Sequence, residues 1–363
     1  MKRFKKIYVE ITNVCNLSCS ICPGTKRSPS HMEPAKFESV LEKISPFSDY
    51  LYLHVMGEPL LHPEFPDILG LCELRKFKVN IATNGVLIGK HKDAILASKS
   101  VRQVNFSIHC LDIQKNSKLP RSYLSDILEF IDEGRRKTKI YFALRLWNMK
   151  PGADANPEIL RQIEKFFLRS GQNEDPDNFA IKRYFNTKEG GHSCPPWRSF
   201  PAKPGPPKRG LENPRSLEER EVQCDYKTTN RNLKEKKGVE LAPNVFLNFA
   251  QEFKWPDLHS KTFPEGKVFC RGMRDHCAIL VDGTVVPCCL DKDGVIPLGN
   301  IFADDFSKLI SGVRAEKIVK GFSEGRAVEE LCKSCEFRNR FSKANIAGTP
   351  RHHDGVLAVL RMH

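Results

Sequence analysis

Long hydrophobic runs are missing from this sequence of 363 residues. No run approaches the ~18 apolar residues that suggest a membrane-spanning helix. The basic start, Met1 to Lys6, leads straight into a strand-like segment without the apolar stretch of a secretory signal peptide. We therefore expect a cytoplasmic protein with no membrane association. In a reducing compartment, the thirteen cysteines are more commonly metal ligands or catalytic groups than disulfides.

A basic stripe interleaved with stacking aromatic residues is also missing, although the net charge is +14. Between Lys182 and Lys237, fourteen Lys and Arg residues stand against seven Asp and Glu residues, beside a cluster of prolines. Such segments are usually solvated, so nucleic-acid binding is not expected. We interpret residues 171–237 as a basic, Pro-rich insertion or linker. A substrate-covering lid, disorder or an error in the sequence would each explain it. Residues 346–363 lack a core pattern and are interpreted as a tail.

The first 170 residues alternate between β-branched runs and amphipathic stretches, which is typical of βα units and a parallel sheet. Five strands are predicted there, at Ile7–Ile11, Tyr50–Val55, Lys78–Ala82, Gln103–Ile108 and Ile140–Leu146. A helix is predicted after each strand, at Ala35–Ile44, Phe65–Leu74, Lys90–Ala97, Ser122–Lys137 and Asn156–Leu168. A sixth strand is predicted at Gly238–Phe249, within a last core segment of residues 238–265. Six parallel strands favour an α/β fold, a partial (β/α)6 barrel that binds its ligand at the C-terminal ends of the strands.

The region of residues 266–345 has a different pattern. Ala278–Val281, the turn Asp282-Gly283 and Thr284–Val286 predict a tight β-hairpin. Two helix-like stretches follow, at Phe306–Ile310 and Ala315–Phe322. We expect these elements to form a small Cys-rich C-terminal α+β domain.

Three cysteines, Cys15, Cys19 and Cys22, directly follow the first predicted strand in a CxxxCxxC spacing. Three thiolates leave one iron of a [4Fe–4S] cluster open to an outside ligand, as a catalytic site requires. A structural zinc site usually needs a fourth protein ligand, and the near candidate, His31, lies in a polar turn. The spacing therefore favours an iron–sulfur cluster with one open iron over zinc.

The CxxxCxxC spacing after a first strand resembles the radical S-adenosylmethionine (SAM) superfamily. The segment Met56-Gly57-Glu58-Pro59, at the end of the second predicted strand, is similar to a Gly-Gly-Glu-Pro segment of that family. In that family, the backbone carbonyls of this segment receive the amino group of SAM. Met56 replaces the first glycine, and Ile21 replaces an aromatic residue that commonly precedes the third cysteine.

Three more positions agree with the family, each near the end of a predicted strand: Asn84, Ser107 and Arg145. The resemblance implies that all three contact SAM. Arg145, as a charge-assisted donor, and Ser107, as a neutral one, would hold the SAM carboxylate. A plain turn at Asn84 and a polar strand residue at Ser107 are the structural alternatives.

Four further cysteines form a second group near the C-terminus: Cys270, Cys288, Cys332 and Cys335. Spacing alone leaves zinc and an iron–sulfur cluster equally open. After a radical SAM core, this layout resembles the SPASM/twitch extension. It implies one auxiliary [4Fe–4S] cluster, because no cysteine follows Cys335. Cys289 is not expected to be a ligand, since neighbouring strand residues face opposite sides, and Cys277 is not assigned.

The resemblance implies reductive cleavage of SAM to methionine and a 5′-deoxyadenosyl radical, which abstracts hydrogen from the substrate. The electron would come from a flavodoxin- or ferredoxin-type donor. A single auxiliary cluster implies that an electron leaves the substrate radical, so we expect an oxidoreductase that performs a two-electron oxidation.

A small molecule or a short peptide is the expected substrate, because the sequence starts at its first strand without the leader-binding domain of many maturases. A peptide maturase is the alternative, and a non-catalytic iron–sulfur or zinc-binding interaction module is the alternative of another class. Glu252, His259 and Arg145 lie in plausible regions for a catalytic base, but their spacing does not choose among them.

Overall fold

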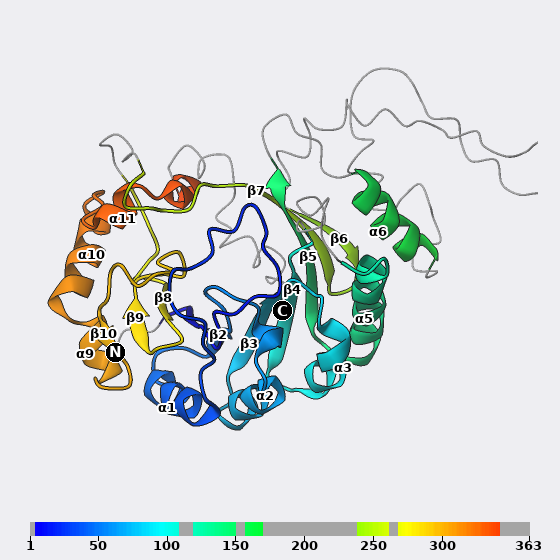
Figure 1. Cartoon of the computed structure of the whole chain (residues 1–363), viewed down its shortest axis with the longest axis horizontal. Coiled ribbons are helices and arrows are strands. Elements are labelled where there is room, and N and C mark those ends of the chain that lie inside the picture. Colours follow the sequence, from blue (N-terminus) through cyan, green and yellow to red (C-terminus); the bar gives the residue numbers. More distant parts are fainter. Residues whose placement is uncertain (1–3, 109–118, 150–156, 170–237, 261–267, 342–363) are drawn as a thin grey trace, which may run out of the picture.

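The computed structural model describes residues 4–108, 119–149, 157–169, 238–260 and 268–341. Six parallel strands curve into an open horseshoe with helices between them (Figure 1). The strands are β1 (Lys6–Val9), β2 (Tyr50–Tyr52), β3 (Lys78–Thr83), β4 (Val101–Phe106), β5 (Tyr141–Met149) and β7 (Val245–Gln251). The helices are α1 (Pro34–Ile44), α2 (Phe65–Leu74), α3 (Ile88–Ala97), α5 (Tyr123–Lys137) and α6 (Pro157–Arg169). The predicted partial (β/α)6 barrel is confirmed.

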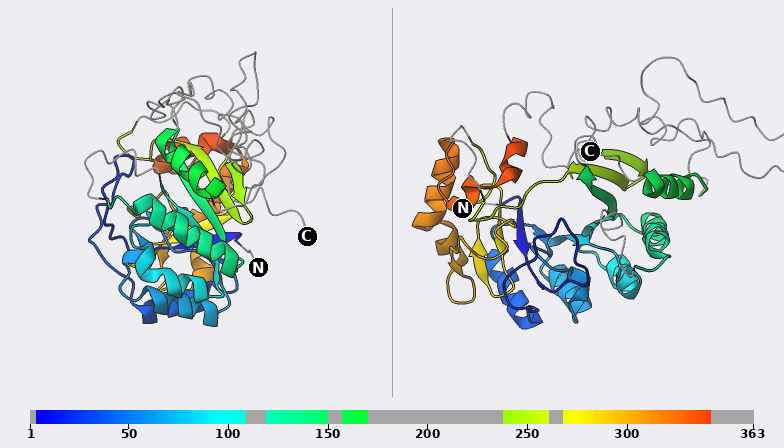
Figure 2. Two further views of the ribbon diagram at one scale, coloured as in Figure 1. Left: turned by 90° about the vertical axis from the view of Figure 1, so that its right-hand side faces the viewer. Right: turned by 45° about the horizontal axis from the view of Figure 1, so that its top comes forward.

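The helices lie along the outer, convex side of the sheet (Figure 2). Their ends follow the usual chemistry of helix termini. Helix α1 begins at Pro34, where the missing N–H of proline costs no hydrogen bond. Helix α5 ends in Arg135, Arg136 and Lys137, whose charges complement the negative end of the helix dipole.

The sixth predicted strand is two strands. Residues Gly238–Ala242 form β6, which pairs antiparallel with β7, and β7 pairs parallel with β5. Proline at 243 has no N–H for a ladder, and Asn244 has a φ of 63°, in the left-handed region that asparagine tolerates better than most residues. The chain therefore reverses at this dipeptide, and the prediction of one continuous strand was wrong.

The C-terminal hairpin is present as predicted, with strands β8 (His276–Ile279) and β9 (Thr284–Val286) pairing antiparallel. The short strand β10 (Gly299–Asn300) follows, then α9 (Phe306–Ile310), α10 (Val313–Ser323), α11 (Glu330–Lys333) and the 3-10 helix η3 (Glu336–Phe341). Strand β8 pairs parallel with β1, so one ten-stranded sheet runs through both parts of the chain in the order β10-β9-β8-β1-β2-β3-β4-β5-β7-β6.

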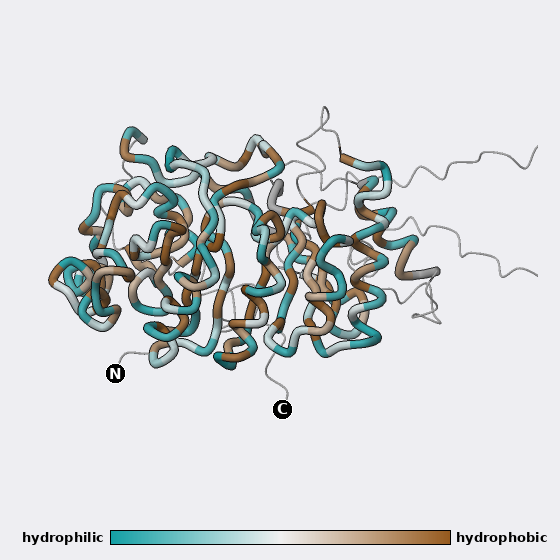
Figure 3. Tube along the Cα trace, turned by 60° about the horizontal axis from the view of Figure 1, so that its bottom comes forward, coloured by the Kyte–Doolittle hydropathy of each residue, from teal (hydrophilic) through white to brown (hydrophobic). Residues whose placement is uncertain are grey.

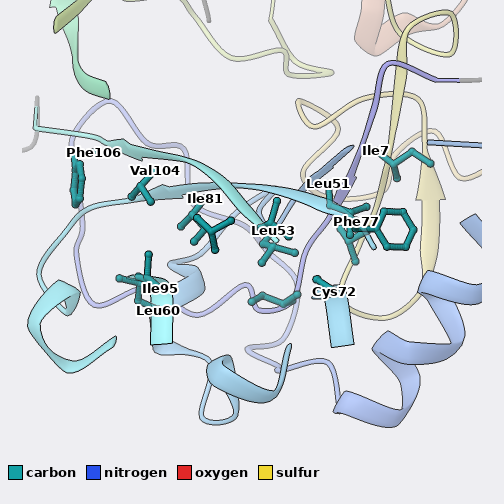
Figure 4. Packing of buried hydrophobic residues seen from close by; sticks show 14 of the residues in the cluster. Ile7, Leu51, Leu53, Leu60, Cys72, Phe77, Ile81, Ile95, Val104 and Phe106 are labelled. Carbon is teal, nitrogen blue, oxygen red and sulfur yellow. The ribbon is translucent and has the colours of Figure 1, made fainter. Parts of the chain in front are cut away.

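The two faces of the sheet differ in chemistry. Side chains such as Ile7, Leu51 and Val104 are fully buried toward the helices, where they pack with the large core cluster (Figure 4). The alternate residues on the inner face include the buried polar groups Gln103 and Asn105, whose side chains are hydrogen-bonded to each other at 2.9 Å. Along the chain, hydrophobic and hydrophilic segments alternate accordingly (Figure 3). Parallel strands buried on both faces are normally apolar throughout, so a polar inner face indicates a ligand-binding side.

Several sequence predictions lie outside the described residues. They are the interpretation of residues 171–237 as an insertion or linker and that of residues 346–363 as a tail. Within the described ranges, no helix is both long and apolar enough to cross a membrane.

Candidate functional site

The first three cysteines lie on the loop between β1 and α1, at the C-terminal edge of the sheet. Cys15 and Cys22 are exposed and Cys19 is half-buried. The backbone N–H of Cys22 donates to the carbonyl of Cys19 at 3.0 Å, which closes a turn. At the base of the loop, Thr12 and His31 form a β-bridge. The loop is therefore held at its two ends while the thiols stay accessible.

The pKa of the Cys15 thiol is raised to about 11. The main cause is the protein atoms that surround the sulfur, although the side chain as a whole is exposed. A hydrogen bond with the backbone of Leu17 lowers the pKa, and the negative charges of Glu58, Cys19 and Cys22 raise it further. Thiols that raise one another's pKa stay protonated together unless a positive group offsets their charge. Iron supplies that positive charge, so this donor set fits the iron–sulfur cluster that its spacing predicts.

Sequence reasoning missed Glu10, a fully buried carboxylate just past β1. Its Oε1 accepts hydrogen bonds from Arg27 at 2.7 Å and from the backbone N–H of Met56 at 2.9 Å. Its Oε2 accepts from the backbone N–H of Val281, beyond β8, at 3.0 Å. One side chain thus joins the end of the cysteine loop, the Gly57 loop and the C-terminal hairpin. The sequence feature that could have indicated Glu10 is an acidic residue within the apolar pattern of the first strand.

The cysteine loop also contacts the segment that follows Cys288. Thr25 donates to the Asp293 carboxylate at 2.7 Å, and the backbone N–H of Lys26 donates to the same oxygen at 3.0 Å. Arg27 Nε donates to the carbonyl of Lys292 at 2.8 Å. These bonds fix the loop of the first cysteine group against the part of the chain that carries the second group.

The loop after β2 carries the predicted SAM-binding segment. Gly57 has a φ of +75°, and a Cβ at this position would lie 2.5 Å from the carbonyl oxygen of Thr12. Only glycine fits both the backbone conformation and the close approach. Met56, which replaces a glycine of the family, has its side chain buried on the inner face. The positive φ is at Gly57 and not at Met56, so the methionine at position 56 does not disturb the turn.

The carboxylate of Glu58 is buried and faces the chain itself. Oε1 accepts from the backbone N–H of Leu60 at 3.1 Å and from the Thr83 hydroxyl at 2.7 Å, and Oε2 accepts from the backbone N–H of Asn84 at 2.7 Å. Burial raises the pKa of Glu58 to about 7, while these three hydrogen bonds lower it. Glu58 therefore positions the ends of β2 and β3 relative to each other. Pro59, the next residue, opens the 3-10 turn η1 (Pro59–Leu61).

Asn84 lies directly beside the first cysteine group. Its Nδ2 lies 4.0 Å from the Cys15 sulfur and 2.7 Å from Oδ1 of Asn16. The Tyr123 hydroxyl of α5 donates to its backbone carbonyl. The structure thus brings Asn84 and Cys15 together, as the shared strand edge predicts.

Ser107 and Arg145 lie side by side at the same edge. Phe106 pairs with Leu144 in the ladder between β4 and β5, which places Ser107 and Arg145 one step further along neighbouring strands. Both residues are half-buried. Burial lowers the pKa of Arg145 to about 10, while the Tyr8 and Tyr52 hydroxyls raise it and the cation of Arg340 lowers it further. A guanidinium in this setting gains from a bound carboxylate.

We define the inner-face cluster as Lys6, Tyr8, Tyr52, His54 and Arg145. The Tyr8 ring lies 5.0 Å from that of Tyr52 and, edge-on, 5.6 Å from that of His54. Nζ of Lys6 lies 4.8 Å from the Tyr52 ring centre. Sequence reasoning singled out Arg145 alone. The signal for the other four was the alternation of polar and aromatic residues with buried aliphatic ones along β1 and β2.

The four C-terminal cysteines are half-buried and close in space. A Cβ at Gly272 would lie 3.7 Å from the Cys270 sulfur and 3.8 Å from Cβ of Cys288. The pKa of Cys288 is raised well above its ordinary value by burial first, then by Cys289, Cys270, Cys332 and Cys335. The pKa of Cys332 is raised by burial, then by Cys270 and Cys335. Only a positively charged group could deprotonate these thiols together, so the donor set fits a metal cluster.

Cys289 and Cys277 have different surroundings. Cys277 is fully buried in the main core. Cys289 packs against the inner-face residues, and its sulfur is hydrogen-bonded to Tyr8. Burial raises the pKa of Cys289, whereas this hydrogen bond lowers it. Among the described residues, no three His, Cys, Asp or Glu side chains already stand at metal-binding distances from one another, so the fit of the two cysteine groups to iron–sulfur clusters rests on their donor chemistry.

The two remaining candidates for a catalytic base lie beyond β7. Glu252 is half-buried, and His259 is exposed. The backbone N–H of His259 donates to the Asp257 side chain at 2.7 Å, and the N–H of Asp257 donates to Ser334, next to Cys335, at 3.2 Å. This segment is therefore attached to the second cysteine group rather than to the first.

Comparison with known proteins matches two regions of the chain, each of which contains one of the cysteine groups. A family model described as the radical SAM superfamily matches residues 9–145, from β1 to Arg145. A second model, described as an iron–sulfur cluster-binding domain and named SPASM, matches residues 270–336. The chain belongs to the radical SAM superfamily. Its cofactors are SAM with a SAM-binding [4Fe–4S] cluster, and an auxiliary iron–sulfur cluster in the SPASM region.

Curated relatives of this radical SAM protein match over part of their length. A tungsten-containing aldehyde ferredoxin oxidoreductase cofactor-modifying protein of Pyrococcus furiosus is 32% identical over 116 residues, which are 31% of this chain and 33% of that protein. The mycofactocin maturase MftC of Mycobacterium ulcerans is 26% identical over 101 residues, 27% of each chain. The GTP 3′,8-cyclase of Synechocystis is 25% identical over 142 residues, 38% of this chain and 43% of that one. The chain thus covers less than half of each of these relatives.

Solved structures agree on the fold. The crystal structure of SuiB from Streptococcus suis bound to S-adenosylmethionine superposes with a TM-score of 0.54 and 16% identity, covering 92% of this chain and 71% of that one. This likeness supports the partial barrel with its SPASM extension.

Proposed function

We propose that this radical SAM enzyme catalyses a two-electron oxidation, in which the auxiliary cluster accepts an electron from the substrate radical. The observation that supports the proposal most directly is the position of the two cysteine groups. Cys289, beside the ligand candidate Cys288, packs against the cluster that contains Tyr8 and Met56, and Met56 directly precedes the loop whose Glu58 acts on Cys15. An electron acceptor at this place would lie next to a substrate held there.

When bound, SAM and its cluster supply reductive cleavage of the C5′–S bond, which yields methionine and a 5′-deoxyadenosyl radical. Cys15, Cys19 and Cys22 would hold the cluster. The backbone carbonyls of the loop from Gly57 to Pro59 would receive the amino group of SAM, and Glu58 keeps that loop in place through its bonds to Thr83 and Asn84.

Ser107 and Arg145 would hold the SAM carboxylate. Their side-by-side position on β4 and β5 suits two oxygens of one carboxylate. Burial lowers the pKa of the Arg145 guanidinium, and a carboxylate held beside it would favour its charged form. The same burial removes competing water, which strengthens the charge-assisted bond.

The substrate is proposed to be a small molecule or a short peptide. A peptide or cofactor maturase is the second candidate function, which the relatives favour through their names, a cofactor-modifying protein and a maturase. The electron would come from a flavodoxin- or ferredoxin-type donor in either case.

A test of the proposed chemistry needs no knowledge of the substrate. The enzyme is reconstituted anaerobically with iron and sulfide, its metals are counted, and SAM and dithionite are added. We expect roughly eight irons per chain, two [4Fe–4S] clusters, and the release of 5′-deoxyadenosine. Cys19→Ala should abolish deoxyadenosine, whereas Cys72→Ala, at a thiol on the buried face of α2, should not.

Two outcomes would count against the proposal. Tightly bound zinc without SAM cleavage would support a non-catalytic binding module instead. If SAM is instead regenerated in the presence of substrate, with no net deoxyadenosine, the protein would still be a radical SAM enzyme, but the two-electron oxidation, which consumes SAM, would be ruled out.

A further inference from the structure

The inner-face cluster lies between the two cysteine groups. His54 precedes Gly57 by three residues on the same strand end, next to the SAM-binding loop. On the other side, Tyr8 is hydrogen-bonded to Cys289, the neighbour of Cys288. A substrate that passes hydrogen to one site and an electron to the other has to lie between them, which is where the cluster lies.

His54 has a buried ring nitrogen that nothing in the structure satisfies. Its Nδ1 is inaccessible to solvent and has no hydrogen-bond partner. The great majority of buried polar side-chain atoms have a partner, and leaving one unpaired costs about 1–3 kcal/mol. The edge-on contacts of His54 with Tyr8 and Tyr52 account for the orientation of the ring but leave this nitrogen unexplained. A bound ligand would explain it.

The charges around His54 indicate what kind of ligand this is. The charged groups that act on the imidazole are Arg145 and Lys6, and both are positive. Burial and these two cations lower the pKa of His54 to about 3, so the ring is neutral at physiological pH. The cation of Arg340 also acts on Arg145. An anion beside His54 would therefore be attracted by Lys6 and by Arg145, and no acidic side chain of the described residues is among the charged groups that act on the imidazole.

We propose that the inner-face cluster is a subsite for an anionic group of the substrate, a carboxylate or a phosphate, which accepts a hydrogen bond from Nδ1 of His54 and faces the cations of Lys6 and Arg145. The Tyr8 and Tyr52 rings form the wall on which Lys6 lies, at 5.4 and 4.8 Å from the ring centres. This inference rests on the proposed function and adds to it a substrate class and a polar anchor, His54.

Direct binding of simple anions tests the subsite. The reconstituted full-length enzyme is titrated with inorganic phosphate and, separately, with acetate, by calorimetry at constant ionic strength. We expect one of the two anions to bind at one site per chain. His54→Phe keeps the ring but removes the nitrogen donor, and Lys6→Met removes a cation, so each should weaken that binding about tenfold or more. Lys78→Met, which removes an exposed lysine at the start of β3, is the matched control and should leave the affinity unchanged.

Phosphate binding would identify a phosphate-bearing substrate, and acetate binding would identify a carboxylate. Equal affinities in the wild type and His54→Phe would overturn the proposal, as would the binding of neither anion. A third arm adds SAM. An anion that competes with SAM occupies the place of the SAM carboxylate, which refutes a separate subsite, whereas simultaneous binding supports it.

A crystal of the wild-type enzyme soaked in phosphate or acetate gives a second measurement if a variant fails to fold. Density between His54 Nδ1 and Lys6 Nζ supports the subsite, and its absence in a crystal soaked with the anion that binds in solution contradicts it. Neither measurement requires SAM cleavage. A failure of the proposed oxidation therefore appears as missing deoxyadenosine or unchanged SAM, and a failure of the subsite appears as missing anion binding.

Discussion

Replacing Arg27 with methionine should destabilise the protein far more than an ordinary surface substitution. Arg27 pairs with the Glu10 carboxylate at 2.7 Å, and the two side chains are 14% and 0% exposed. Removing one partner of a buried ion pair costs about 3–5 kcal/mol, because the other charge stays buried without compensation. The backbone N–H groups of Met56 and Val281 still donate to Glu10 in the variant. We therefore expect a loss at the lower end, about 3 kcal/mol.

Urea unfolding of the apoprotein, followed by far-UV circular dichroism, measures this loss as the shift of the midpoint multiplied by the slope m. Glu10→Gln and the double variant complete a double-mutant cycle, in which we expect a coupling energy of about 1.5 kcal/mol or more. The matched control is Arg314→Met, which breaks the pair with Glu329 at 2.8 Å, whose side chains are 42% and 18% exposed. An exposed pair of this kind contributes about 0–1 kcal/mol.

The result that refutes this reasoning is a loss for Arg27→Met no larger than that for Arg314→Met, with no coupling to Glu10. It would mean that the carboxylate is satisfied without its cation, and that the bond from Arg27 to the hairpin side of the site has no energetic weight.

Three further predictions address single residues of the site. Gly57→Ala should lower the free energy of unfolding by more than about 1 kcal/mol and weaken SAM binding, because Gly57 has a φ of +75° and a Cβ there would lie 2.5 Å from a backbone atom. The control Gly70→Ala, in α2 with nothing within 4 Å of the added Cβ, should raise the free energy of unfolding by up to about 1 kcal/mol. Urea unfolding and SAM titration measure both variants. Burial raises the pKa of Glu58 from its ordinary 4.5 to about 7. The unfolded chain therefore loses this proton at lower pH than the folded protein, and the free energy of unfolding falls by about 3 kcal/mol relative to Glu58→Gln as pH rises from 4.5 to 7. Parallel plots of unfolding free energy against pH for the two proteins would contradict this. Cys288→Ala should lose roughly four irons per reconstituted chain, while Cys289→Ala should lose none; iron analysis decides between them, and equal losses would mean that the ligand assignment is wrong.

Much of the fold follows from sequence because it depends on local patterns. Each βα unit combines a β-branched run with an amphipathic helix, and both periods are visible within about ten residues. The error at Gly238–Phe249 has the same origin. Apolar residues alternate on both sides of Pro243-Asn244 as though one strand continued, and only the left-handed conformation of Asn244 reveals the reversal.

The pairing of β8 with β1 is a different case. The partners Lys6 and His276 are far apart in sequence, and parallel pairing needs no turn between them. No local pattern records such a contact, so the sequence predicted the hairpin but not its place at the edge of the core sheet.

The residues of the candidate site also fall into those that the sequence predicts and those that only the structure reveals. Cysteine spacing indicates both metal-binding groups, because ligand geometry restricts how far apart the cysteines can be in sequence. The roles of Glu10 and His54 depend on neighbours contributed by distant segments, Val281 for Glu10 and Arg145 for His54. A single polar residue on a strand is more often structural than functional, so only its three-dimensional surroundings set these two apart.

The continuous sheet also constrains how this protein is synthesised. Strand β1 leaves the ribosome 270 residues before its partner β8, as the pairing of Lys6 with His276 shows. At about 5–20 residues per second, that delay is on the order of 15–50 s. During this time one edge of β1 has backbone groups without their final partner, which is the kind of edge that pairs with other chains. Productive folding of the nascent chain therefore depends on shielding this edge until translation has passed Ile279, and a gene fragment that ends before β8 would yield an aggregating product.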